Sequence, residues 1–183
     1  MTGLHPDFRA VLFDIDGTLL RATRRSEYRE EMCAMLRRIF GTEGELRRVD
    51  FAGRTDLSIY REALETHGFT VEDIRTGLPQ LKAASVEIVD RMSREGEVFR
   101  LCAGVRPLLE AVSGDGRFVC TLLTGNLEDL AMAKLRSVGL AQYFPVRGAY
   151  GSDAEDRNRL PAIAAQRFFD QLGRDLPAER MII

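Results

Sequence analysis

Two aspartates stand one residue apart at the end of an apolar run in the segment AVLFDIDGTLL, residues 10–20. Asp14 and Asp16 are followed by Gly17 and a threonine, which is also the composition of an ordinary turn. On extended backbone, alternate side chains point to one side, so both carboxylates can approach one end of a site. Such a pair suits a nucleophile with a proton-transfer partner, or a site for a hard cation.

A second apolar run, CTLL, ends in a similar way. Thr124, Gly125 and Asn126 follow it and lead into a segment with helical periodicity, for which Asn126 is a plausible N-cap. A hydroxyl with free amides at a helix N-terminus is a suitable holder for a phosphoryl group. A simple helix cap is the alternative, but two apolar runs that both end in such residues favour a shared site.

A third group of polar residues precedes the helical segment 160–172. Arg157 and Arg159 stand there, and a cation in this place could neutralise a phosphate oxygen. The alternative is a solvated charged surface. Of the two, Arg157 is the favoured candidate.

The elements that must position these residues alternate between apolar runs and amphipathic segments. Residues 8–13, 118–123 and the end of the chain are typical of strands buried on both faces of a parallel sheet. Helical periodicity is found at residues 26–40, 56–67, 71–94, 105–114, 126–140 and 160–172. Asp56 is a possible N-cap, and Gly77-Leu78-Pro79 a possible break. The pattern predicts an α/β fold: a Rossmann-like parallel sheet with helices on both faces and an inserted all-helical cap.

Composition narrows the function classes. The chain has 183 residues, of which 45% are hydrophobic and 30% charged, and a formal net charge of −2. This balance offers no basic surplus for nucleic acid or an anionic membrane. No apolar run approaches membrane-spanning length, and the first residues lack a secretory layout. Three scattered cysteines are interpreted as small buried hydrophobic residues, so we expect a cytoplasmic protein. The oligomeric state stays open.

These pieces, in this order, resemble the haloacid dehalogenase-like superfamily. DIDGT matches its first motif, D-x-D-G-T, and LLTGN matches its second, a Ser or Thr after an apolar strand. Arg157 stands where the third motif has a basic residue, usually Lys. The helical insert resembles the cap of the phosphoglycolate phosphatase-like branch, which implies a core of residues 1–20 and 99–183 and a cap of residues 21–98. FAGRTD resembles the cap segment that reaches toward substrate, which makes Arg54 and Thr55 expected substrate contacts.

The resemblance implies a Mg²⁺-dependent phosphatase acting on a small phosphate ester, of the phosphoglycolate or sugar-phosphate type. Asp14 would attack phosphorus to form an aspartyl-phosphate, and Asp16 would move the proton. Magnesium would be bound by the Asp14 carboxylate and the Asp16 main-chain carbonyl. The residues expected to hold the phosphoryl group are Thr124, Gly125, Asn126 and Arg157.

One departure concerns the family's fourth motif, which supplies further acidic metal ligands. The chain stops at Ile183, inside the apolar run that should lead to them. We expect a chain whose C-terminal strands are missing, and a natural protein with a weakened metal site is the alternative. Three other activities stay open: a phosphomutase, a 2-haloacid dehalogenase and a non-catalytic phosphate-binding remnant. Asp16 argues against the dehalogenase, because a halide leaves without a proton.

Overall fold

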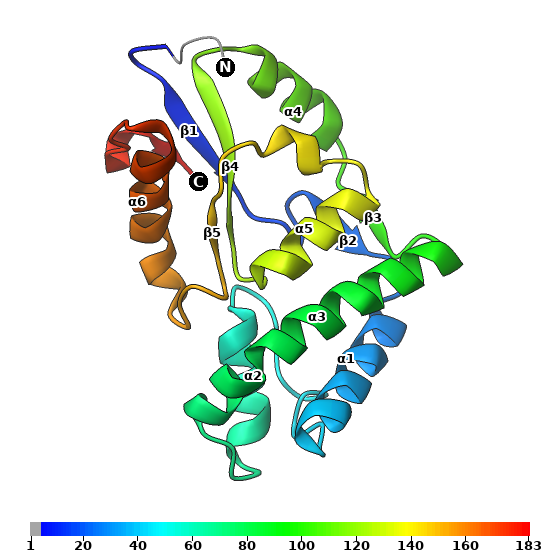
Figure 1. Ribbon diagram of the computed structural model, residues 1–183. Helices are drawn as coiled ribbons and strands as arrows, with labels where there is room; N and C mark the ends of the chain where they lie inside the picture. The colour runs from blue at the N-terminus through cyan, green and yellow to red at the C-terminus, as the bar shows by residue number, and fades with distance from the viewer. Residues whose placement is uncertain (1–4) are drawn as a thin grey trace.

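The computed structural model describes residues 5–183, so residues 1–4 of the expected core segment lie outside the described residues. Four parallel strands form the central sheet in the order β5-β4-β1-β6 (Figure 1). β1 lies inside the sheet because its residues are almost all apolar, and it pairs with β4 from Arg9↔Phe118 to Phe13↔Leu122. The strands are β1 (Arg9–Phe13), β4 (Phe118–Thr124), β5 (Ala149–Tyr150) and β6 (Met181–Ile182).

Helices cover both faces of this sheet. α6 (Leu160–Leu172) lies on one face, and α4 (Val105–Gly114) and α5 (Glu128–Ser137) lie on the other (Figure 1). Alternate residues of β1 divide between them: Ala10 and Leu12 join the apolar cluster under α6, whereas Phe13 joins the larger cluster on the opposite side. The predicted α/β class with helices on both faces is therefore confirmed.

Three helices form an insert between β1 and the rest of the sheet. They are α1 (Arg25–Phe40), α2 (Asp56–Glu65) and α3 (Val71–Glu95), and we call them the helical insert. α3 packs against both α1 and α5 (Figure 1). Short 3₁₀ turns complete the chain at Ala141–Tyr143, Arg157–Arg159 and Ala178–Arg180.

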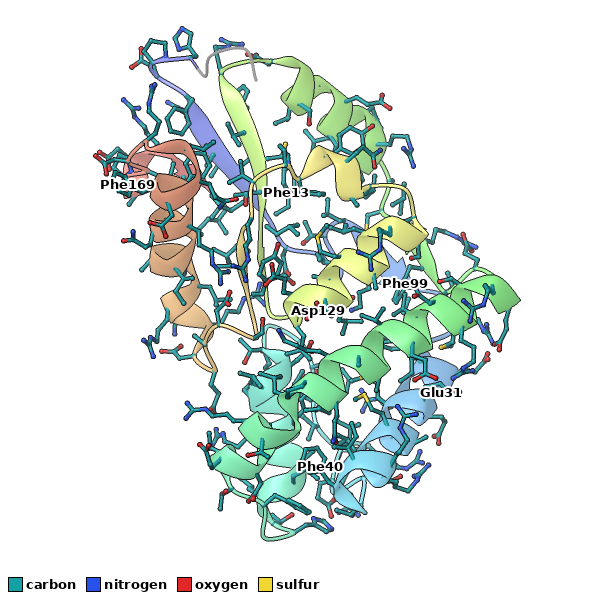
Figure 2. All side chains as sticks on the ribbon, viewed as in Figure 1. Phe13, Glu31, Phe40, Phe99, Asp129 and Phe169 are labelled. Atoms are coloured by element: carbon teal, nitrogen blue, oxygen red, sulfur yellow. The ribbon has the colours of Figure 1, made fainter. Side chains whose placement is uncertain are left out.

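The possible break at residues 77–79 does not occur, since α3 continues through Pro79. Proline inside a helix costs about 3 kcal/mol, but the buried face of α3 after this point offsets that cost by packing. Gly77 has its own role: a Cβ there would lie 2.7 Å from Cζ of Phe40, so glycine lets the ring, which Figure 2 labels, pack against the helix. The buried residues of α3 beyond Pro79 are Leu81, Ala84, Ser85, Ile88, Val89 and Met92.

A two-stranded antiparallel ribbon joins the helical insert to the sheet. β2 (Leu20–Ala22) and β3 (Phe99–Leu101) pair there, with Arg21 opposite Arg100. These two strands, and β5 as well, are not predicted from the sequence, because two or three residues are too few to show a periodicity. The expected cap boundaries, residues 21 and 98, fall at or next to this ribbon.

Two expected helix caps are wrong. The N-cap of α2 is Thr55, whose Oγ1 accepts from the Ser58 N–H at 3.2 Å, and Asp56 is the first helical residue. The N-cap of α5 is Leu127 rather than Asn126. In both places the expected capping side chain makes a contact with a distant part of the chain instead.

Two further observations concern cysteines and helix length. All three cysteines are free thiols: Cys33 and Cys120 are buried, and Cys102 is half-buried. Within residues 5–183, the structure has no helix whose length and apolar character would suffice for crossing a membrane.

Candidate active site

Asp14 directly follows β1 and meets an arginine from the other end of the sequence. Nη2 of Arg157, in the 3₁₀ turn before α6, donates to Oδ2 of Asp14 at 2.7 Å. The other carboxylate oxygen accepts the N–H of Ile15 at 2.8 Å. The Asp14 and Arg157 side chains are 30% and 29% exposed, so both remain open to a ligand. Of the two arginines considered from the sequence, Arg157 makes this contact.

Asp16 binds Lys134, which is not among the residues predicted from the sequence. Nζ of Lys134 donates to both carboxylate oxygens, at 3.0 and 2.8 Å, and Nδ2 of Asn126 donates to Oδ2 at 2.7 Å. Burial raises the pKa of Asp16, but the charge of Lys134 and these hydrogen bonds outweigh burial, so the pKa lies below its ordinary value. Asp16 is therefore held as a carboxylate.

Lys134 is almost completely buried, with 4% of its surface exposed. It lies on the apolar face of α5, three and four residues after the buried Ala131 and Leu130, and its ammonium also donates to Oδ1 of Asn126 at 2.7 Å. The rings of Tyr28 and Phe99 lie 5.7 and 5.5 Å from Nζ, within cation–π range. A lysine at an apolar position of a helix is the signal that could have identified it, because a buried charge requires a partner.

The residues of the second motif differ in how they contribute to the site. Thr124 is completely buried, and its Oγ1 accepts from Nδ2 of Asn126 at 2.9 Å. Gly125 and Asn126 lie on the wall of a cavity, whereas Thr124 lies behind it. The loop thus presents backbone and an amide side chain to the cavity, and the threonine hydroxyl supports the amide.

The two residues of the helical insert that were expected to contact substrate, Arg54 and Thr55, also have different surroundings. Arg54 lines the cavity and forms an ion pair with Glu62 of α2. Thr55 is buried, and its hydroxyl donates to the backbone oxygen of Glu155 at 2.7 Å. Thr55 thus attaches the insert to the core, while Arg54 faces the cavity.

We call the contact of residues 54–56 with residues 125–127 the insert–core contact. The Asp56 N–H donates to the Gly125 oxygen at 2.7 Å, and Oδ2 of Asp56 accepts the Leu127 N–H at 2.7 Å. A Cβ on Gly125 would lie 1.9 Å from the Arg54 oxygen, so only glycine allows this approach. Burial raises the pKa of Asp56 to about 6, against the opposing influence of Lys134 and the Leu127 N–H.

One cavity of about 470 Å³ connects these groups. Its volume is in the range of sites for small molecules. Its wall is drawn from the β1 loop, α5, the helical insert and the turn before α6, and includes Asp14, Asp16, Asn126, Lys134, Arg54 and Arg157. We take this cavity as the candidate active site.

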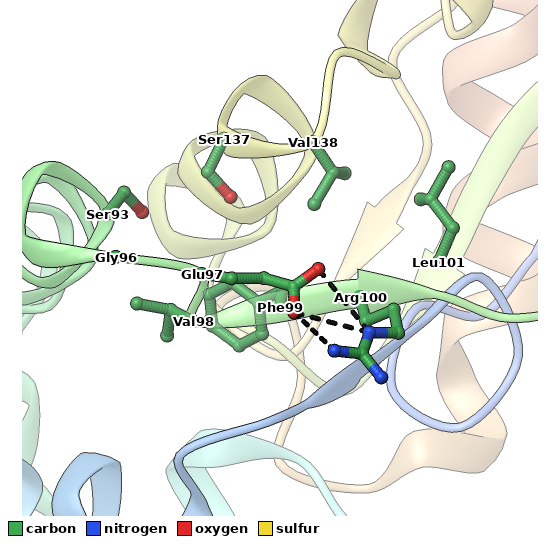
Figure 3. A pocket seen from close by; sticks show the side chains of 9 residues that line it. All are labelled: Ser93, Gly96, Glu97, Val98, Phe99, Arg100, Leu101, Ser137 and Val138. Atoms are coloured by element: carbon green, nitrogen blue, oxygen red, sulfur yellow. Dashed lines mark hydrogen bonds and ion pairs between the residues drawn. The ribbon is translucent and has the colours of Figure 1, made fainter.

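A second cavity, of about 380 Å³, lies beside β3 (Figure 3). The carboxylate on its wall, Glu97, forms an ion pair with Arg100 at 2.7 Å. Two serines, Ser93 and Ser137, also line it. This wall brings together no pair of carboxylates, so it lacks the groups that the candidate active site combines.

The donor set near Asp14 suits a hard cation. Within residues 5–183, no three His, Cys, Asp or Glu side chains are grouped to hold a metal ion. Mg²⁺, however, keeps several waters and uses one or two carboxylates together with substrate phosphates. The Asp14 carboxylate and the Asp16 backbone carbonyl are oxygen donors of that kind, and Asp14 and Asp16 both line the cavity. The residues present therefore fit Mg²⁺ with a small protein contribution.

Comparison with known proteins agrees with this geometry. A model of the haloacid dehalogenase-like hydrolase family matches residues 11–182. The chain therefore belongs to this family, which confirms the resemblance seen in its motifs. No curated protein sequence matches the chain.

Solved structures share the fold at low sequence identity. CbbY from Rhodobacter sphaeroides in complex with phosphate is 19% identical, with a TM-score of 0.61, over 96% of this chain and 76% of that chain. A predicted phosphoglycolate phosphatase from Haemophilus somnus 129PT is 16% identical, with a TM-score of 0.59, over 96% and 75%. A mutant of the same CbbY in complex with xylulose-(1,5)bisphosphate is 18% identical, with a TM-score of 0.62, over 96% and 76%. At these identities the likeness establishes the fold.

Proposed function

We propose that this protein is a Mg²⁺-dependent phosphatase that hydrolyses a small phosphorylated metabolite, of the phosphoglycolate or sugar-phosphate type, through an aspartyl-phosphate intermediate. The observation that carries the proposal is the placement of Asp14, paired with Arg157, and Asp16 on the wall of one small cavity. Structures with the same fold include a predicted phosphoglycolate phosphatase and a complex with a sugar bisphosphate, which supports the substrate class.

The reaction follows from the two carboxylates. An oxygen of Asp14 attacks phosphorus, the bond from phosphorus to the ester oxygen breaks, and the leaving alkoxide takes a proton from Asp16. Water then attacks the phosphorus of the aspartyl-phosphate and gives a proton to Asp16, which releases phosphate and restores Asp14. Mg²⁺ held by the Asp14 carboxylate and the Asp16 carbonyl would reduce the repulsion between carboxylate and phosphate.

Arg157 and the second-motif loop hold the phosphoryl group in this proposal. A phosphoryl group bound at Asp14 would accept hydrogen bonds from the Arg157 guanidinium, which now binds the Asp14 carboxylate. Gly125 and Asn126 lie on the same wall, where the Gly125 N–H is a backbone donor. The Asn126 amide now donates to Asp16 and Thr124, so it would exchange one of these hydrogen bonds for one to a phosphoryl oxygen.

The contact between Asp16 and Lys134 favours one of the two steps. As a carboxylate with a lowered pKa, Asp16 is in the form that accepts a proton from water in the second step. The first step requires a protonated Asp16, so we expect Asp16 to move away from Lys134 when substrate binds.

The same proposal includes the organisation and setting of the chain. Residues 21–98 would act as a cap that closes over the small cavity and excludes water, on a core formed by residues 1–20 and 99–183. The three free thiols support a reducing, cytoplasmic setting.

The test is hydrolysis of p-nitrophenyl phosphate with Mg²⁺ and with EDTA. Asp14→Asn should lower kcat by at least about 10³-fold, since it removes the nucleophile. The matched control is Asp90→Asn, on the exposed surface of α3, which should retain the wild-type rate. EDTA should abolish the activity of the wild type and of Asp90→Asn. Equal rates for wild type and Asp14→Asn would exclude Asp14 as the nucleophile.

A further inference from the structure

Basic side chains outnumber acidic ones on the wall of the candidate active site, and most of them already have partners. Arg157 binds Asp14, Lys134 binds Asp16, and Arg54 binds Glu62. Arg29 donates to the backbone oxygens of residues 46, 47 and 49 and lies over the ring of Phe51. The two remaining basic residues are Arg21 and Arg25.

The side chains of Arg21 and Arg25 have no hydrogen-bond or ion-pair partner among residues 5–183, and both residues are exposed. Arg21 lies in β2 of the ribbon, and Arg25 is the first residue of α1. The acidic residues on the same wall are already engaged: besides Asp14 and Asp16, Asp56 accepts the Leu127 N–H. Asp50, the fourth, accepts the Ala52 N–H at 3.0 Å. Six side chains on this wall are basic and four are acidic, so the wall has a surplus of basic groups, and Arg21 and Arg25 contribute to it without an acidic partner among the described residues.

The sequence places basic residues at the N-terminus of α1, where a helix favours acidic ones. A helix N-terminus carries partial positive charge and favours acidic residues, yet the N-cap and the first residue of α1 are Arg24 and Arg25. Arg24 is paired with Glu27, but Arg25 has no acidic neighbour of this kind among the described residues. Residues that break a local rule without compensation in the fold are expected at functional positions. An anion between Arg21 and Arg25 would supply the missing compensation.

We propose that Arg21 and Arg25 form a second anion subsite, so that the natural substrate carries an anionic group besides the phosphoryl group that meets Asp14. This inference rests on the proposed phosphatase function and narrows its substrate class to molecules with two anionic ends. Guanidinium groups bind carboxylate and phosphate with the same paired donors, so either can be the second anion. A cavity of about 470 Å³ has room for a small molecule of this kind.

The experiment compares matched substrates that differ in the second charge. One pair is 2-phosphoglycolate and 2-hydroxyethyl phosphate, and the other is fructose 1,6-bisphosphate and fructose 6-phosphate. In the wild type, kcat/KM should favour the doubly anionic member of at least one pair by about tenfold or more, and that pair identifies carboxylate or phosphate. The ratio is the readout, because both members share the reacting phosphate ester.

Three variants separate charge from structure. The double variant Arg21→Gln/Arg25→Gln should bring the ratio to within about twofold of one, whereas Arg21→Lys/Arg25→Lys keeps the charges but loses the paired donors and should retain only part of the preference. Arg94→Gln, an exposed arginine of α3 without a partner among the described residues, is the control and should leave the ratio unchanged. A preference that survives in the glutamine variant would overturn the subsite.

The subsite and the phosphatase function fail in different ways. If p-nitrophenyl phosphate is hydrolysed in an Asp14-dependent manner but neither pair shows a preference, the subsite is wrong and the proposed function stands. If nothing is hydrolysed, the proposed function fails, and calorimetry with the same four compounds judges the subsite. Binding of a doubly anionic member about tenfold tighter than its partner, lost in the glutamine variant, would then support it, and equal binding would overturn it.

Discussion

The two sides of the candidate active site are built in different ways. On the core side, charged side chains from distant parts of the sequence meet as pairs, Asp14 with Arg157 and Asp16 with Lys134. On the side of the helical insert, the hydrogen bonds end on backbone groups of the core, and Gly125 leaves no room for a side chain against the Arg54 carbonyl. The core side is therefore controlled by charge, and the insert–core contact by shape.

Two carboxylates near the same lysine show what this difference means. Asp16 is bonded directly to Lys134, and its pKa is lowered although burial opposes this. Asp56 is buried and has Lys134 only as a nearby charge, so burial dominates and its pKa rises to about 6. A direct ion pair on the core side holds an acid ionised, whereas the packed contact of the insert favours the neutral form.

Among the substitutions that test this difference, Gly125→Ala is expected to have the largest effect on stability and activity. The added Cβ would lie 1.9 Å from the Arg54 oxygen, so the insert must move away. We expect a loss of unfolding free energy of about 3 kcal/mol or more, together with a strong loss of activity. Gly114→Ala is the control, because nothing lies within 4 Å of its Cβ position. Urea unfolding checks both, and equal stabilities would contradict the close contact.

Asp56→Asn should reveal the buried carboxylate through pH. The pKa of Asp56 is about 6 in the folded protein and 3.8 ordinarily, so its ionisation favours unfolding. This destabilisation is absent below pH 3.8, grows as the pH rises and is complete above pH 6. Between these limits the variant should gain up to about 3 kcal/mol relative to wild type.

The measurement is urea unfolding of both proteins at about pH 4 and about pH 7. Asp90→Asn, at an exposed position, controls for the general effect of removing one acid. A difference between Asp56→Asn and wild type that does not change with pH would mean that Asp56 ionises as freely in the folded protein as in water.

A smaller effect is expected from the Asp16–Lys134 pair. Lys134→Met and Asp16→Ala each remove one partner, and a hydrogen-bonded charge pair contributes about 1–3 kcal/mol. Because the Asp16 side chain is half exposed, the interaction energy from the double-mutant cycle should lie near 1 kcal/mol. Urea unfolding of the four proteins gives this value. Additive effects would indicate that Lys134 stabilises the fold through its other contacts, with Asn126, Tyr28 and Phe99.

The same contrast explains how much could be predicted from the sequence. The fold class, three of the four strands of the main sheet and the six helices follow from apolar runs and helical periods that are continuous in the sequence. The first motif is local as well, so Asp14 and Asp16 stand out at once.

The rest depends on contacts between distant segments. In the sequence, Lys134 is one residue of an amphipathic helix. Its role becomes visible only in the fold, which places Asp16 2.8 Å from its ammonium. Asn126 and Asp56 have the sequence signature of helix caps, but Asp16 and the Leu127 N–H compete for their side chains. Pro79 suggests a helix break, and only the packed face of α3 shows why the helix continues. Local patterns predict elements, whereas partners that arrive through the fold decide what a polar side chain does.

The central claim is that Asp14 accepts the phosphoryl group, and an acyl phosphate can be detected directly. Borohydride reduces an aspartyl-phosphate to homoserine, so the protein should be quenched during turnover, reduced, digested and analysed by mass spectrometry. Homoserine is expected at position 14, dependent on substrate, while the neighbouring Asp16 is unchanged. Active turnover that leaves Asp14 unreduced, or that marks another acid instead, would contradict it.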